Sequence, residues 1–111
     1  MGSDPRLTSD IQISALKRLA EVGGGFATVL RKGDPTSGAI LIIGLVRGEN
    51  PLLFDRFPSF DGELAWQKIA DNEADVSAQW QKRAARDPDL WVIELDVASI
   101  ERLNDLTGTR Y

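Results

Sequence analysis

The stretch that decides the fold is Ala39-Ile40-Leu41-Ile42-Ile43-Gly44-Leu45-Val46, a run without a single polar or charged side chain. Turn-forming residues precede the run and Arg47 ends it. A short apolar run bounded in this way predicts a strand that is buried on both faces, and such a strand lies in the interior of a sheet. The run is far shorter than the roughly 20 apolar residues that cross a bilayer, so it predicts no membrane span.

Four other segments carry strand signals. The clearest is 90–97, where Trp91, Ile93, Leu95 and Val97 alternate with Leu90, Val92, Glu94 and Asp96. Segments 26–31 and 52–57 are short and rich in β-branched, aromatic or other apolar residues, which also indicates strands. Segment 63–70 fits either a strand or a helix, and the Asp61-Gly62 turn before it favours the strand.

The helical period marks three further segments, at about 10–22, 73–86 and 97–106. Ser9 and Gln12 have the spacing of a capping box at the start of the first helix. Asn72 is a suitable N-cap for the second helix, and Asp87-Pro88 ends it because proline disfavours a helical residue before it. The third helix is short and closes the chain.

The expected architecture is a single α+β domain over residues 5–111. Its elements follow the order helix, four strands, helix, fifth strand and short helix, which indicates an antiparallel or mixed sheet. We expect the first four strands to form an antiparallel meander. In that arrangement, strands 26–31 and 39–46 form a hairpin around the turn-rich loop 32–38.

The composition excludes several kinds of chemistry. The chain of 111 residues contains no Cys and no His. It therefore has no disulfide, thiolate nucleophile, histidine zinc site or Ser-His-Asp triad. A net charge of −4 argues against a dedicated nucleic-acid binder, since such binders neutralise phosphates with Lys and Arg. No cationic segment followed by an apolar stretch opens the chain, so we expect a cytoplasmic protein.

Two blocks of sequence resemble a known family. They are Arg31-Lys32-Gly33-Asp34-Pro35-Thr36-Ser37-Gly38-Ala39-Ile40-Leu41 and Asp87-Pro88-Asp89-Leu90-Trp91-Val92-Ile93-Glu94-Leu95. Both are similar to blocks in a bacterial family of short proteins, typical of alphaproteobacteria, that is known only as a domain of unknown function. The resemblance implies a one-domain cytoplasmic protein. It implies no activity and assigns no catalytic residue.

The first block contains two glycines at the spacing of a phosphate-binding loop. Ala39-Ile40 stand where such a loop has Lys followed by Ser or Thr, and a strand follows in place of a helix. The helix N-terminus that would hold a phosphate is therefore missing. We interpret 32–38 as a turn-rich loop in which Asp34 accepts hydrogen bonds from nearby backbone.

Glu94 is the most informative charged residue because it lies on an otherwise apolar strand. Such a carboxylate is expected at a sheet edge or in an ion pair, and Arg31 and Arg47 are the candidate partners. Arg31, Lys32, Arg47 and Arg56 are expected to gather at one end of the sheet as an anion patch. Trp91 is expected in the core. The residues predicted to bind a ligand or partner are Arg31, Lys32, Asp34, Arg47, Arg56, Asp89, Trp91 and Glu94.

Two functional hypotheses follow. The favoured one is a small non-enzymatic module that binds a protein partner or forms a homo-oligomer. The alternative is a protein, or an enzyme, that binds a small anion with an arginine cluster and Glu94. We predict no catalytic residue, metal site or cofactor, because the acidic residues near Asp89 lack the further ligands of a calcium loop.

Overall fold

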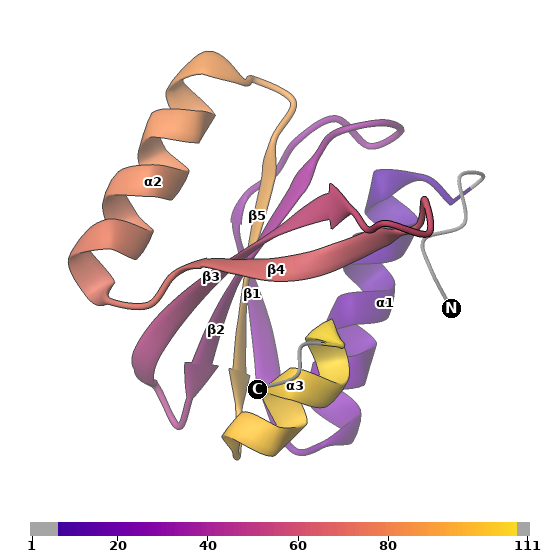
Figure 1. The fold of residues 1–111 in the computed structure, drawn as a ribbon. Helices are drawn as coiled ribbons and strands as arrows, with labels where there is room; N and C mark the ends of the chain where they lie inside the picture. Colours follow the sequence, from indigo (N-terminus) through magenta and orange to yellow (C-terminus); the bar gives the residue numbers. More distant parts are fainter. Residues whose placement is uncertain (1–6, 109–111) are drawn as a thin grey trace.

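The computed structural model describes residues 7–108, and its elements follow the predicted order (Figure 1). The helices are α1 (Ser9–Val22), α2 (Glu73–Arg86) and α3 (Ile100–Thr107). The strands are β1 (Phe26–Arg31), β2 (Ile40–Val46), β3 (Glu49–Pro58), β4 (Leu64–Ala70) and β5 (Trp91–Val97). The α+β class is confirmed, and the ambiguous segment before α2 is a strand.

The five strands form one mixed sheet in the order β1-β5-β2-β3-β4. Strands β2, β3 and β4 form the expected antiparallel meander, whereas the expected β1–β2 hairpin is wrong. Strand β5 lies between β1 and β2, and it is parallel to β2 and antiparallel to β1. The physical reason is burial: β5 carries apolar residues on both faces, so an interior position covers more of its surface than an edge would.

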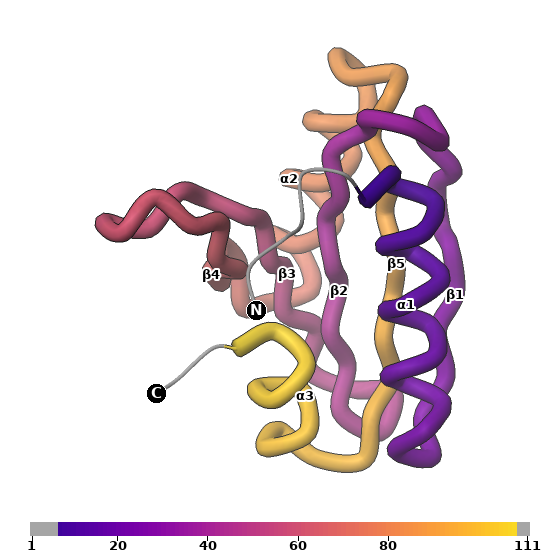
Figure 2. The backbone as a smooth tube through the Cα atoms, turned by 90° about the vertical axis from the view of Figure 1, so that its right-hand side faces the viewer, coloured from indigo at the N-terminus to yellow at the C-terminus, as the bar shows by residue number. Residues whose placement is uncertain are grey.

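Helices cover both faces of the sheet (Figure 1). Helices α1 and α3 pack on one face, and Figure 2 looks onto that face with α1 over β5 and β1. The core on this side is built around Phe54, Trp91, Ile93, Leu95 and Leu103. Helix α2 packs on the other face, above β3 and β4. Among residues 7–108, no helix is both long enough and apolar enough to cross a membrane.

The N-terminal ends of α1 and α2 differ in how closely they follow the sequence prediction. Asn72 caps α2 as expected, because its side chain accepts a hydrogen bond of 2.9 Å from the backbone N–H of Asp75. The capping box at Ser9 is wrong, since Thr8 is the N-cap of α1. The Ser9 hydroxyl is buried and donates instead to the carbonyl of Gly38 at 2.7 Å. This contact ties α1 to the loop between β1 and β2.

Candidate functional site

The two sequence blocks meet at one end of the sheet. The backbone N–H of Asp34 donates to the carbonyl of Asp89 at 3.0 Å, and that of Trp91 donates to Ala39 at 2.8 Å. The indole Nε1 of Trp91 donates to the carbonyl of Asp34 at 2.7 Å. We call this set of contacts between loop 32–39 and segment 87–91 the loop junction. It gives both blocks a structural role.

Arg31 and Trp91 are part of this loop junction. The Nη2 atom of Arg31 lies 3.4 Å from the carbonyl oxygen of Asp87 and 3.3 Å from that of Pro88. The guanidinium thus holds the turn that leads from α2 into β5. Trp91 is 4% exposed and belongs to the core, as predicted. Lys32 and Asp89 have exposed side chains at the surface of the junction.

Asp34 fixes the conformation of the loop from within. Its carboxylate accepts hydrogen bonds from the backbone N–H of Ser37 at 2.8 Å and of Thr36 at 3.0 Å. The predicted bonding of Asp34 to nearby backbone is confirmed. These two bonds favour the charged form, so they hold the pKa of Asp34 below its usual value.

Acidification is expected to remove the stabilisation that Asp34 contributes. Folding lowers the pKa of Asp34, so its contribution to stability is fully present at a pH above the pKa that Asp34 has in the unfolded chain. The contribution is lost as the pH falls through the lower pKa that Asp34 has in the folded chain. Asp34→Ala should therefore be less stable than the wild type at neutral pH and equally stable at low pH. Urea denaturation over a pH series measures this, and a difference that does not change with pH would contradict it.

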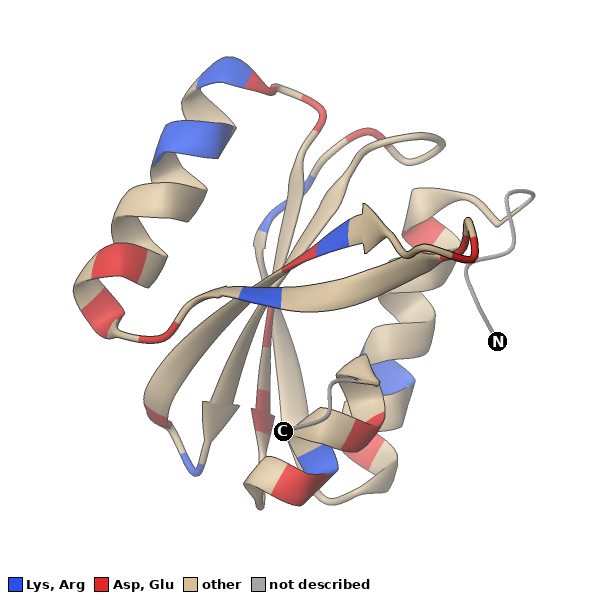
Figure 3. Ribbon diagram, in the orientation of Figure 1, with Lys and Arg blue, Asp and Glu red and all other residues tan. Residues whose placement is uncertain are grey.

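The predicted anion patch is wrong, because the Lys and Arg residues of the described chain are spread over the molecule and do not gather at one end of the sheet (Figure 3). Arg31 ends β1, which runs opposite to β2, whereas Arg47 follows the end of β2. The two residues therefore lie at opposite ends of the sheet, and Arg47 donates from Nε to the carbonyl of Ala98 at 3.3 Å. Arg56 lies on the α1 and α3 side, over the ring of Trp66. An arginine cluster that acts together with Glu94 is thus not formed.

Glu94 lies on the other side of the sheet, where α2 covers only part of the surface. Thr28 and Ile43 are its neighbours on β1 and β2, and Asp96 follows it on the same face. Neither of the two expected arginines pairs with it. We define the open face as Phe26, Thr28, Leu30, Leu45, Glu94 and Asp96. Phe26 is 61% exposed and Leu30 is 42% exposed, so this part of the sheet lacks a covering element within the described chain.

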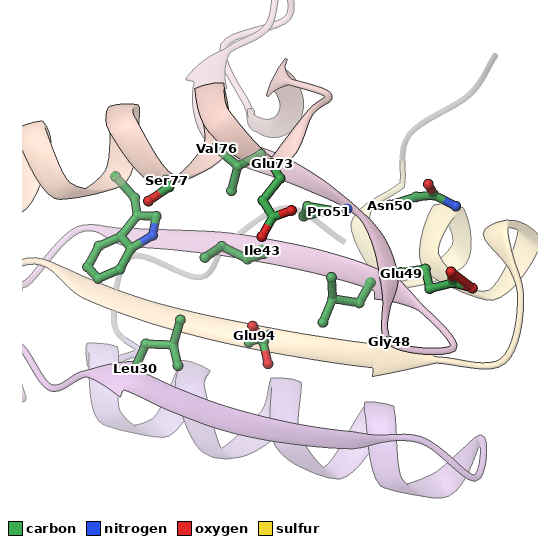
Figure 4. Close-up of a pocket in the computed structure, with 12 residues that line it drawn as sticks. Leu30, Ile43, Gly48, Glu49, Asn50, Pro51, Glu73, Val76, Ser77 and Glu94 are labelled. Carbon is green, nitrogen blue, oxygen red and sulfur yellow. The ribbon is translucent and has the colours of Figure 1, made fainter.

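A groove of about 520 Å³ separates α2 from the open face. Glu73 from α2 and Glu94 from β5 extend into it from opposite sides (Figure 4). Leu30, Val76 and Trp80 supply apolar walls, and no Lys or Arg of the described residues lines it. Within residues 7–108, no group of three or more acidic side chains is placed to hold a metal ion. The groove therefore offers carboxylates and apolar surface.

The free edge of β1 borders the open face. Within residues 7–108, strand β1 pairs only with β5, so half of its backbone N–H and C=O groups point away from the sheet. Edge strands are usually protected by charges or prolines, and the stretch from Phe26 to Leu30 contains neither. Sequence analysis missed Phe26, Thr28 and Leu30. The available signal was alternation, because Ala27 and Val29 are the β1 residues that pack on the core.

Fold and surface together define a class: a small α+β protein with one mixed sheet, no assembled catalytic group among its described residues, and an unprotected edge. The chain belongs to the family described as "Protein of unknown function (DUF1491)", whose model matches residues 7–105. The predicted membership in a bacterial family of unknown function is confirmed.

Solved structures of relatives agree with this assignment. A crystal structure of a DUF1491 family protein from Caulobacter crescentus has 41% identity and a TM-score of 0.77, covering 84% of this chain and 90% of that one. An NMR structure, also of a DUF1491 family protein from C. crescentus, has 41% identity and a TM-score of 0.71, covering 83% of this chain and 87% of that one. A solution structure of a protein from A. tumefaciens has 30% identity and a TM-score of 0.73, covering 88% of this chain and 92% of that one. A comparison with curated proteins finds no match.

Proposed function

We propose that this protein is a small cytoplasmic interaction module that self-associates through the free edge of β1 and the open face. The observation that carries the proposal is the edge itself. It combines unpaired backbone groups with two large apolar side chains, Phe26 and Leu30, that no described element covers. An edge of this kind is a template for pairing with another strand.

A second copy of the chain fits this edge by symmetry. If two β1 strands pair antiparallel with Thr28 on the two-fold axis, Phe26 of one copy lies opposite Leu30 of the other. Both apolar pairs then fall on the open face, and each such cross-strand pair contributes roughly 0.2 to 1 kcal/mol. The bulge between Val29 and Arg31 increases the local twist, and the strand before it is regular.

Charge complementarity supports the same arrangement. The antiparallel arrangement brings the end of β1 next to Lys32 in one copy beside the start of β1 in the other. Asp96 lies beside Phe26 at the same end of the strand. Opposite charges therefore meet at both ends of the paired strands, whereas a parallel pairing would bring the basic ends together.

Phe26→Lys is expected to weaken self-association by tenfold or more, about 1.4 kcal/mol, because it replaces an apolar contact with a charge at the interface. Phe26 is largely exposed in the single chain, so the variant should fold normally. Phe60→Lys is the matched control, since Phe60 is fully exposed in the turn between β3 and β4.

Sedimentation equilibrium over a wide concentration range measures the effect. The wild type and Phe60→Lys should both approach twice the monomer mass at high concentration, and Phe26→Lys should remain monomeric. A wild type that stays at the monomer mass throughout would contradict the proposal. So would equal association of Phe26→Lys and the wild type.

A further inference from the structure

We propose that the groove between α1, α3 and the β3–β4 pair binds a small monocarboxylate with an apolar body, and that Arg56 binds the carboxylate. This groove lies on the side of the sheet opposite the open face, so the inference is independent of the proposed self-association. It rests on the position of Arg56, the lack of an ion pair to its guanidinium in the described chain, and the apolar walls.

The guanidinium of Arg56 is held in a fixed position. Arg56 and Trp66 are directly opposite each other on β3 and β4, and the guanidinium carbon lies 4.7 Å from the centre of the Trp66 ring. Its Nη1 donates to the side-chain oxygen of Gln12 on α1 at 2.7 Å. A cation that stacks on an aromatic ring and bonds a neutral amide is already oriented for an incoming ligand.

The charge of Arg56 has no carboxylate partner within residues 7–108. Two ion pairs join Arg83 to Asp55, at 2.9 Å, and to Asp87, at 3.8 Å, and neither includes Arg56. Asp55 is the sequence neighbour of Arg56, but the alternation of β3 directs it to Arg83 on the other face of the sheet. Burial lowers the pKa of Arg56, and the nearby charge of Asp55 offsets this effect only in part. An anion would compensate this charge, and a guanidinium binds a carboxylate with two parallel hydrogen bonds.

Apolar side chains form the rest of the groove, which encloses about 530 Å³ and is within the range of small-molecule sites. Leu16 and Leu19 line it from α1, Leu64 and Trp66 from β4, and Leu106 from α3. Leu19 is 46% exposed and Leu64 is 44% exposed, so a ligand would cover apolar surface that is now in water. These walls suit an alkyl or aryl body.

Acidic residues in the groove restrict the ligand to one negative charge. Asp61, Glu63 and Asp105 contribute to the lining, and the hydrogen bonds that Asp61 accepts from Ser59 and Glu63 lower its pKa and keep it charged. A phosphate or dicarboxylate would place additional negative charge close to these groups. A single carboxylate at Arg56, with an uncharged body, keeps this repulsion smaller than a ligand with two negative charges would.

Octanoate is a suitable probe, with octanol as its uncharged analogue and inorganic phosphate as an anion without an apolar body. Isothermal titration calorimetry with the full chain should show saturable octanoate binding with a dissociation constant of about 1 mM or lower. Octanol should bind at least tenfold more weakly, and phosphate should not bind. Arg56→Gln should weaken octanoate binding at least tenfold and remove the preference over octanol. Absence of octanoate binding by the wild type, or equal affinity in Arg56→Gln, would overturn the proposal.

A charge reversal at Leu64 provides a second test that does not alter Arg56. Leu64→Glu should weaken octanoate binding at least tenfold, whereas Leu64→Lys should bind octanoate more tightly than Leu64→Glu. Phe60→Glu controls for a change of net charge, because Phe60 is exposed and does not line the groove. Circular dichroism establishes that each variant is folded. An equal effect of Leu64→Glu and Leu64→Lys would overturn the proposal even if Arg56→Gln does not fold.

Discussion

Gly33→Ala is expected to destabilise the fold by about 4 kcal/mol or more, the size of effect reserved for severe steric or burial defects. A Cβ atom at this position would lie 2.1 Å from the carbonyl oxygen of Asp89 and 2.6 Å from the carbonyl carbon of Leu90. Both are backbone atoms, so neither can rotate away as a flexible side chain would. The added methyl group would separate the two segments of the loop junction and break the hydrogen bond between Asp34 and Asp89.

Urea denaturation of Gly33→Ala and Gly62→Ala distinguishes this steric effect from an ordinary glycine effect. Gly62 has a φ of +87° and open space around it, so Gly62→Ala should cost only about 1 to 2 kcal/mol from the left-handed backbone. If Gly33→Ala were as stable as Gly62→Ala, the close approach of the loop to segment 87–91 would be wrong.

Trp91→Ala is expected to cost about 3 to 5 kcal/mol, as truncations of large buried aromatic residues do. Trp91 is 4% exposed and packs in the core between the sheet and α1. The truncation would leave a cavity and would also remove the Nε1 hydrogen bond to the carbonyl of Asp34. Since small domains are stable by only about 5 to 15 kcal/mol, this single change should leave the protein marginally folded.

Trp91→Phe separates the two contributions, because it keeps an aromatic ring and removes the donor. We expect a loss of about 1 to 2 kcal/mol for this variant, close to the cost of an unmade hydrogen bond. Thermal unfolding followed by circular dichroism measures both variants. A Trp91→Ala protein as stable as the wild type would contradict the buried position of Trp91.

The elements of this fold could be predicted from the sequence because their signals are local. Alternation along 90–97 marks β5, and Asn72 marks the start of α2 without reference to any other part of the chain. The buried position of Trp91 follows from the same alternation. Each of these features depends only on residues that are close together in the sequence, so one sequence is enough to predict it.

The pairing of strands could not be predicted in the same way. Both β2 and β5 are strongly apolar, and no local feature of the sequence predicts that β5 inserts between β1 and β2. That insertion makes Thr28 and Ile43 the neighbours of Glu94 and puts Glu94 on the open face. Arg31 and Arg47 lie at opposite ends of the sheet for a different reason: β1 and β2 run in opposite directions, as they would also have done in the expected hairpin. The predicted arginine cluster was therefore inconsistent with the predicted meander.

The pairing of Arg56 with Trp66 had a signal that sequence analysis did not use. Both residues lie five positions from Asp61, on opposite sides of the Asp61-Gly62 turn. An antiparallel hairpin centred there places them opposite each other on the same face, as the structure confirms. The contact of Arg56 with Gln12 had no such signal, since it depends on how α1 packs on the sheet.

The most direct test of the central claim is an isotope-filtered NOE experiment on a concentrated mixture of labelled and unlabelled protein. Only contacts between different copies produce signals in this experiment. The proposed pairing predicts intermolecular NOEs between the ring of Phe26 and the methyl groups of Leu30, together with an NOE between the two Thr28 residues on the symmetry axis. The absence of intermolecular NOEs, or NOEs confined to residues of β4, would contradict it.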